Sequence, residues 1–435
     1  MIVVFLFRRL YAFSSGDCSC FVPAIVASDV CQGTDFPIYF EKFLSVYAII
    51  DLHDRFVTAA AYKSRLRSAH IRSCSFLKSE EDFILMKTAV MYGKQDVRIE
   101  DRPVPEVGPG QMLVKISYVG ICGTDVEFFN SGDVPTPLPK ILGHENSGVV
   151  VKVGEGVTNF RPGDKVLCGP PKQCREGCPS CRAGKPNICI HGFPNTAGIG
   201  MPDGGYAEYF LVRDVAHTMV IKVPEDVDLK DAVLFDVICV ALHGIRISRF
   251  KLGDAVVVSG MGPVGLSAVQ FLKAGGARKV IALDISDEKA EIARRYGADL
   301  FINTTGCENL SDRIKEACGS ETGADVVYEC AGNPKSFHTC IYDCVKPGGQ
   351  VMGIGTIQQP LDMIPGQISI FEIDIQFSFV YTEDEVEMYL SMLADGKVEF
   401  PDMVTRIVSL DDCVEKGLGL KDRSRELKIL IQPDQ

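Results

Sequence analysis

The amino-acid sequence predicts an α/β protein in which a β-rich region precedes a doubly wound parallel sheet. Beyond residue 250, short apolar strand patterns alternate with amphipathic helical patterns. A glycine-rich turn joins the first of these strands to the first of these helices. After residue 86, strand patterns are separated by proline and glycine, which is typical of an all-β beginning.

The composition is that of a globular protein of two or three domains. The chain has 435 residues, of which 46% are hydrophobic and 23% are charged. Its net charge of −12 gives no field that attracts phosphate backbones or anionic lipid, so we expect no nucleic-acid partner. No stretch reaches the roughly 18 apolar residues that a membrane span needs. The longest apolar stretch near the N-terminus, residues 1–7, ends at Arg8 and Arg9.

Residues 1–85 show no sustained periodicity, and we expect a poorly ordered extension without catalytic function. A targeting sequence, a genuine extension and an upstream stretch wrongly joined to the chain are the alternatives. The acidic residues of the segment argue against a transit peptide. The 17 cysteines are odd in number and follow no clear secretory signal, which favours a reducing, cytoplasmic location.

From Met86 onward the elements can be predicted in order. In the β-rich region we expect strands at 87–92, 97–100 and 112–119. In the second region the expected strands are 255–259, 280–284, 300–302, 325–328 and 350–353. The helices between them are expected at 264–273, 287–296, 310–317 and 335–345, lengths that suit right-handed crossovers.

A dinucleotide site is predicted where the first parallel strand ends. The turn has the sequence Gly260-Met-Gly262-Pro263-Val264-Gly265 and lies between a strand and a helix, whereas a glycine-rich turn outside that context would carry little weight. Gly260 permits the tight turn, Gly262 lets the backbone approach a pyrophosphate, and Gly265 lets helix and strand pack closely.

The second parallel strand ends at Asp284, nineteen positions after Gly265. A carboxylate at this place accepts hydrogen bonds from ribose hydroxyls and repels a 2′-phosphate. No arginine follows within the next few residues, so the sequence favours NAD over NADP.

Four cysteines within sixteen residues predict a structural zinc site. They are Cys174, Cys178, Cys181 and Cys189. The spacing suits a closed tetrahedral thiolate site, and disulfide pairing is the main alternative.

A second constellation is dispersed along the chain. It comprises Cys122 with Thr124, His144 with Glu145, and Asp236 just before the nucleotide-binding region. One thiolate, one imidazole and one carboxylate could leave a fourth zinc position open to water or substrate, as a catalytic site requires. Singly, the cysteine could be a core residue, the histidine a surface residue and the aspartate a helix cap.

With these motifs in place, the sequence resembles the zinc-containing medium-chain alcohol dehydrogenases, the group that includes sorbitol, threonine and secondary-alcohol dehydrogenases. The resemblance runs from Met86 to the C-terminus. It rests on Gly143-His144-Glu145, Pro162-Gly-Asp-Lys-Val166, the four-cysteine loop and the GMGPVG turn in combination.

The resemblance implies a GroES-like catalytic domain at 86–238, a Rossmann NAD-binding domain at 239–378 and a return to the catalytic domain at 379–435. It implies catalytic zinc bound by Cys122, His144 and Asp236, with Glu145 beside it. An aspartate at position 236 resembles the third zinc ligand of the secondary-alcohol and formaldehyde dehydrogenase branches of the family. The polyol dehydrogenase branch usually has Glu-Pro at this position. Relatives of this kind are dimers or tetramers, so a homo-oligomer is expected.

The expected activity is hydride transfer from an alcohol to NAD, the alcohol being a secondary alcohol, a polyol or an amino alcohol. Thr124 would pass the hydroxyl proton outward. Many relatives end this proton relay with a histidine at the position of Glu127, and they place two residues rather than three between the first two loop cysteines. The alternatives are a zinc-free quinone or enone reductase of the same fold and a non-catalytic nucleotide-binding protein.

Overall fold

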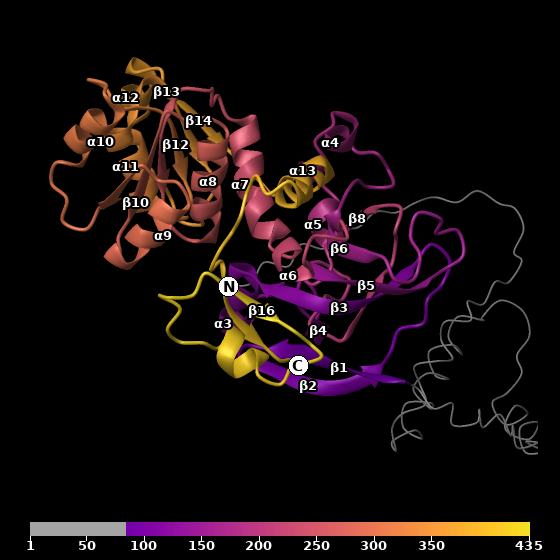
Figure 1. The fold of residues 1–435 in the computed structure, drawn as a ribbon. Coiled ribbons are helices and arrows are strands. Elements are labelled where there is room, and N and C mark those ends of the chain that lie inside the picture. The colour runs from indigo at the N-terminus through magenta and orange to yellow at the C-terminus, as the bar shows by residue number, and fades with distance from the viewer. Residues whose placement is uncertain (1–83) are drawn as a thin grey trace, which may run out of the picture. The chain divides into compact units, whose positions relative to one another are not determined.

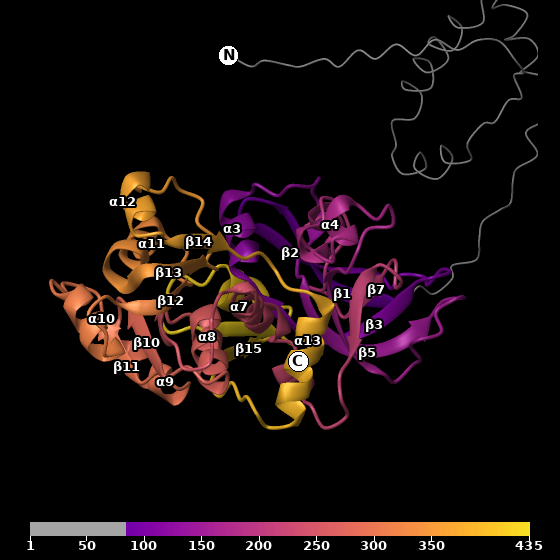
Figure 2. The same ribbon diagram turned by 90° about the horizontal axis from the view of Figure 1, so that it is seen from above.

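The computed structural model describes residues 84–435, which lie in one compact unit. The predicted N-terminal extension lies outside the described residues, apart from its last two. Figures 1 and 2 show this unit from two directions. No helix in the described part is long and apolar enough to cross a membrane.

The N-terminal part of the unit is β-rich, as the sequence predicts. Its strands are β1 (Leu85–Gly93), β2 (Asp96–Pro103), β3 (Met112–Ile121), β4 (Lys140–Ile141), β5 (Glu145–Val153), β6 (Lys165–Pro171), β7 (Tyr209–Val212) and β8 (Thr218–Lys222). Its helices are short: α3 (Gly123–Ser131), α4 (Pro179–Arg182), η2 (Pro186–Ile188), α5 (Gly192–Asn195) and α6 (Leu229–Ala232).

These strands form two sheets whose inner faces share one apolar core. The small sheet has the order β2-β1-β4. The large sheet has the order β15-β16-β3-β5-β6-β8, with β7 also paired to β3. Its first two members, β15 (Val404–Val408) and β16 (Lys428–Ile431), come from the C-terminus of the chain. A π-helical turn, η5 (Cys413–Leu418), follows β15.

The second part is a six-stranded parallel sheet of order β11-β10-β9-β12-β13-β14. Its strands are β9 (Ala255–Ser259), β10 (Lys279–Asp284), β11 (Leu300–Asn303), β12 (Ala324–Glu329), β13 (Val345–Gly353) and β14 (Asp374–Phe377). The first five confirm the predicted strands. The sixth has no predicted counterpart.

Helices cover both faces of this sheet (Figure 2). One face packs on α8 (Pro263–Ala274) and α9 (Ala290–Arg295), and the other on α10 (Leu310–Cys318) and α11 (Pro334–Thr339). Residues predicted as one helix at 335–345 divide into α11 and a π-helical turn, η4 (Cys340–Cys344). The helix predicted at 287–296 begins with a 3-10 turn, η3 (Asp287–Lys289), and α12 (Pro365–Ile370) precedes the last strand.

Two helices connect the parts. In both views α7 (Phe235–Ile247) lies beside α13 (Glu383–Ala394), and α7 also packs on α8 (Figures 1 and 2). Phe235 and Ile238 of α7, Tyr389 of α13 and Tyr381, just before α13, belong to the same apolar cluster as one face of the parallel sheet. The start of α7 is therefore held firmly, and Asp236 lies in its first turn.

Candidate active site

Three elements bring the dispersed constellation together. Cys122 directly follows β3, His144 and Glu145 stand at the start of β5, and Asp236 is in the first turn of α7. One possible ligand atom from each of these four residues lies within 4.8 Å of the other three. The predicted metal-ligating residues are thus close enough to bind one ion, although they span more than a hundred positions of sequence.

His144 is oriented by a buried carboxylate. Its Nδ1 lies 3.7 Å from Oδ1 of Asp125, within ion-pair range, and neither atom has a hydrogen-bond partner within the described residues. Asp125 is held in turn by the hydroxyl of Tyr206 and the N–H of Cys122, each 2.9 Å from Oδ2. Burial opposes a charge on His144, but the nearby Asp125 carboxylate raises the imidazole pKa well above its usual value. The arrangement presents Nε2 to an ion, with a carboxylate behind the ring.

Glu145 is paired with a lysine from the far end of the chain. The Lys428 ammonium lies 2.5 and 2.6 Å from the two carboxylate oxygens, and both side chains are almost fully buried. Burial raises the pKa of Glu145 to about 7, while the Lys428 charge lowers it. A Cβ at Gly120 would lie 1.8 Å from the carboxylate, so the pair needs glycine there.

The remaining carboxylate, Asp236, is free to bind an ion through one oxygen. Its Oδ1 accepts a hydrogen bond of 2.5 Å from the hydroxyl of Tyr381. No hydrogen bond to Oδ2 occurs within residues 84–435. Glu145 is thus paired with Lys428, whereas one oxygen of Asp236 has no hydrogen bond within the described residues. Cys239, in the same helix as Asp236, is buried and lies outside this group of four residues.

The constellation opens onto a cavity of about 460 Å³. Cys122, His144, Asp236 and Thr124 all line it. The Thr124 hydroxyl lies 3.8 Å from the Cys122 sulfur, so the predicted relay residue stands beside the predicted ligands. Glu127 is exposed and does not line the cavity, and its carboxylate is 3.4 Å from the Gln358 amide nitrogen.

The four loop cysteines also converge. Their sulfur atoms lie within 4.8 Å of one another, and all four are free thiols. Three residues between Cys174 and Cys178 are accommodated because Gly177 takes a φ of +56° and the Cys178 N–H points to the Cys174 sulfur at 3.2 Å. A hydrogen bond from the Cys181 N–H lowers the pKa of Cys178 to about 6, whereas burial raises the pKa of Cys189 to about 12. Four converging sulfur atoms suit a tetrahedral zinc ion. Zinc binds cysteine thiols in their deprotonated form, and the lowered pKa of one of the four favours that form.

The glycine turn has the geometry that a dinucleotide needs. Gly260 has a φ of +95°. A Cβ at Gly265 would lie 1.7 Å from the Gly260 carbonyl oxygen, whereas one at Gly262 would meet nothing within 4 Å. Pro263 is the first residue of α8 and Val264 the second, so the helix N-terminus faces the open side of the turn. Backbone and helix therefore leave room for a pyrophosphate.

Asp284 lies beside that turn. Its Oδ2 accepts the Met261 N–H at 2.7 Å, and its Oδ1 accepts the N–H groups of Ile285 and Ser286 at 2.8 and 3.0 Å. Three backbone donors hold the carboxylate at the end of β10, where a ribose would lie.

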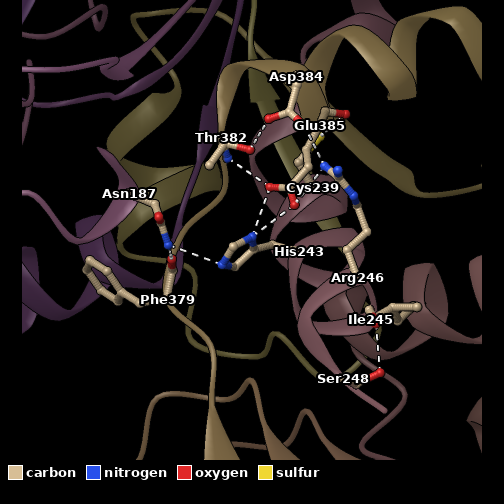
Figure 3. A network of polar contacts seen from close by, with 10 residues as sticks. All are labelled: Asn187, Cys239, His243, Ile245, Arg246, Ser248, Phe379, Thr382, Asp384 and Glu385. Carbon is tan, nitrogen blue, oxygen red and sulfur yellow. Dashed lines mark hydrogen bonds and ion pairs between the residues drawn. The ribbon is translucent and has the colours of Figure 1, made fainter. Parts of the chain in front are cut away.

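Sequence reasoning missed a polar network, drawn in Figure 3, of which Asn187 and Phe379 line the cavity. His243 Nδ1 lies 2.9 and 3.0 Å from the Glu385 carboxylate oxygens, and its Nε2 lies 3.1 Å from the Asn187 amide nitrogen. The same amide nitrogen donates to the Phe379 carbonyl at 2.9 Å. Since that nitrogen is a donor, Nε2 acts as acceptor and His243 carries its proton on Nδ1. Asn187, two positions before Cys189, thereby links the cysteine loop to α7 and α13.

Two family models match successive parts of the chain. A family model described as alcohol dehydrogenase GroES-like domain matches residues 108–225, and one described as zinc-binding dehydrogenase matches residues 263–395. The probable D-xylulose reductase A of Aspergillus clavatus is 34% identical over 347 residues, covering 76% of this chain and 94% of that protein.

Solved structures share the fold over the same part of the chain. The 2R,3R-butanediol dehydrogenase of Bacillus subtilis aligns with a TM-score of 0.72 and 30% identity, over 80% of this chain and 99% of its own. The galactitol-1-phosphate dehydrogenase of Escherichia coli aligns with a TM-score of 0.72 and 28% identity, over 80% and 100%.

Proposed function

The chain belongs to the zinc-binding medium-chain alcohol dehydrogenase family, and from this premise we propose that Cys122, His144 and Asp236 form its catalytic zinc site. Family membership makes the protein a zinc-dependent alcohol or polyol dehydrogenase that uses NAD(P). The observation that carries the assignment is the convergence of one thiolate, one imidazole and one carboxylate on the wall of a 460 Å³ cavity.

Each residue of the proposed site has its own role in the reaction. When bound, zinc supplies a Lewis acid that lowers the pKa of an alcohol hydroxyl, and NAD⁺ accepts the hydride from the carbon. Asp125 keeps the His144 ring in a ligating orientation. Tyr381 holds one oxygen of Asp236 and leaves the other for the ion. Thr124 accepts the hydroxyl proton and releases its own toward solvent.

The cofactor is proposed to be NAD rather than NADP. Asp284 places a negative charge where a 2′-phosphate would lie, and Gly260, Gly262, Pro263, Val264 and Gly265 receive the pyrophosphate. We also propose that Cys174, Cys178, Cys181 and Cys189 hold a structural zinc ion.

The predicted domain division remains a proposal. It assigns residues 86–238 and 379–435 to the catalytic domain and 239–378 to the NAD-binding domain. Pairing of the C-terminal β16 with β3 supports the return of the chain to the first part.

Assembly and location are proposals as well. The unpaired edge of β14 supports a homo-oligomer, either a dimer or a tetramer. Among residues 84–435 no strand pairs with its outer edge, and Phe377 in this strand and Phe371 shortly before it are about half exposed. The free thiols of the described part support a cytoplasmic location.

The test is NADH formation by the zinc-loaded protein with a panel of alcohols, comparing wild type with Asp236→Asn. Asp236→Asn removes the charge that helps hold the ion, so turnover and one equivalent of zinc are expected to be lost while NAD affinity stays unchanged. Asp231→Asn, on the adjacent α6, is the matched control and should retain both. Full activity and zinc content in Asp236→Asn would reject the site, and zinc-independent reduction of an enone would favour the reductase alternative.

A further inference from the structure

A second cavity, of about 370 Å³, opens beside the cysteine loop, and none of the proposed catalytic ligands lines it. Of the four loop cysteines, Cys174 and Cys189 line this cavity, whereas Cys178 and Cys181 do not. The cavity therefore reaches the proposed structural zinc site at two of its four sulfur atoms.

Two further side chains that can bind a metal line the same cavity. Glu176 lies between the first two loop cysteines, and His191 follows the last of them by two positions. One oxygen of Glu176, one ring nitrogen of His191 and the Cys174 sulfur all lie within 4.8 Å of one another. Neither Glu176 nor His191 is buried. Thiolate, imidazole and carboxylate are the ligand types that zinc takes in proteins, so these atoms form a further candidate zinc site.

Backbone hydrogen bonds fix the place of both residues relative to the loop cysteines. The Gly177 N–H donates to the Cys174 carbonyl at 3.2 Å and closes a turn that contains Glu176. The His191 N–H points to the Cys189 sulfur at 3.4 Å, and the His191 carbonyl accepts the Asn195 amide at 2.8 Å. The candidate site is therefore attached to the cysteine loop at both ends.

The arginine next to Glu176 has another partner. Two nitrogens of the Arg175 guanidinium lie 2.7 and 2.8 Å from the Asp214 carboxylate, which also lies 3.1 Å from Nδ1 of His217. Within residues 84–435, no hydrogen bond or ion pair engages the Glu176 carboxylate or the His191 ring. Both side chains therefore keep their ligand atoms available for a cation.

The two candidate zinc sites of the loop differ in how readily they exchange an ion. In the proposed four-cysteine site, sulfur takes every position of the tetrahedron, so no bound water is present for an incoming ligand to displace. Cys174, Glu176 and His191 supply three ligands and leave the fourth position to water, as in open zinc sites. An ion held there can exchange its water for the Cys189 sulfur, which lines the same cavity.

We propose that Cys174, Glu176 and His191 form a transfer site through which zinc enters and leaves the four-cysteine site. Cys174 stays bound to the ion. Bonds to Glu176 and His191 break as bonds to the other three sulfurs form, the thiol protons pass to solvent, and zinc remains divalent. This inference rests on the proposed structural zinc site and adds the route by which that site is loaded.

The test follows metal exchange in the zinc-loaded full-length protein. Added Cd²⁺ is softer than Zn²⁺ and prefers thiolate ligands, so cadmium–thiolate absorption reports its entry into the four-cysteine site. Glu176→Gln and His191→Asn each remove one ligand of the transfer site, so each should slow this exchange by about 10-fold or more. Zinc content at equilibrium and alcohol turnover should match wild type in both variants, because the four sulfurs and the catalytic residues remain.

His217→Asn is the matched control. His217 lines the same cavity but lies outside the transfer site, so its variant should exchange metal at the wild-type rate. His191→Asn also separates ligation from a general effect of charge, because it removes a ligand nitrogen and leaves the Glu176 carboxylate in place. Slower exchange in Glu176→Gln alone would trace the effect to negative charge and overturn the transfer site.

The remaining outcomes separate this inference from the proposal on which it rests. Unchanged exchange in both variants would overturn the transfer site and leave the structural zinc site standing. Loss of one equivalent of zinc at equilibrium in either variant would make its residue a permanent ligand and would also overturn the transfer site. Full zinc content in Cys178→Ser would overturn the structural zinc site, and this inference with it.

Discussion

Lys428→Met is expected to destabilise the protein strongly, because it leaves the Glu145 carboxylate buried without its partner. The two side chains are 5% and 1% exposed, so solvent screens the lost interaction little. Removing one member of such a pair costs about 3–5 kcal/mol. With an unfolding entropy of about 2.1 cal/mol/K per residue over roughly 350 residues, the melting temperature should fall by about 4–7 °C.

The loss should depend on pH in a direction that burial dictates. Burial holds the pKa of Glu145 above its unfolded value, and removal of Lys428 takes away the charge that lowers it. Between the unfolded and the folded pKa, the folded state binds the proton that the unfolded state has released, so stability falls as pH rises. In the wild type this window ends near pH 7. In Lys428→Met it extends higher, so the deficit should be larger at pH 8.5 than at pH 5.5.

Thermal unfolding followed by circular dichroism, with chelator in all samples, measures the effect without interference from bound zinc. Lys397→Met is the control, because its ion pair with Asp395 is exposed and should contribute less than about 1 kcal/mol. The double variant Lys428→Met/Glu145→Gln should recover most of the loss, since no buried charge remains. A melting temperature of Lys428→Met within 1 °C of wild type at pH 8.5 would refute this reasoning.

Three further predictions test other parts of the molecule. Cys178→Ser should lower zinc content by about one ion per chain and reduce stability more than turnover, because a closed thiolate site holds a loop; unchanged stoichiometry in metal analysis would exclude structural zinc there. Asp284→Ala should weaken NAD binding and reduce discrimination against NADP, which kinetics with both cofactors would reveal, and an unchanged preference would reject the ribose role. A variant that begins at Met86 should stay soluble and active, and its loss of activity would show that residues 1–85 contribute to the fold.

The parallel sheet was the most predictable part of the fold. Its first five strands are apolar runs buried on both faces, and local signals such as the glycine turn punctuate them. The sixth strand, Asp374–Phe377, is different because none of its residues is fully buried, whereas the other edge strand, β11, buries two of its four residues. The sequence of the sixth strand alternates polar and apolar residues over only four positions, too few to separate it from a loop.

The candidate site was predictable only where a motif is local. Cys122, His144 and the four loop cysteines stand in short patterns that can be read from the chain. Lys428 and Tyr381 cannot be found in this way, because they contact Glu145 and Asp236 across 283 and 145 positions of sequence. Nothing in their neighbouring residues indicates a carboxylate partner.

These long-range partners make the C-terminal return part of the proposed metal centre. Lys428 belongs to β16, which pairs with β3 beside Gly120, and Tyr381 lies two positions before α13. Without the first, Glu145 would compete with Asp236 for the ion; without the second, Asp236 would lose the hydrogen bond that fixes one of its oxygens. The nucleotide-binding sheet and the local ligand motifs therefore do not by themselves form the proposed site. The last strand of the chain must also be in place, because its lysine pairs with Glu145 and leaves Asp236 as the carboxylate for the ion.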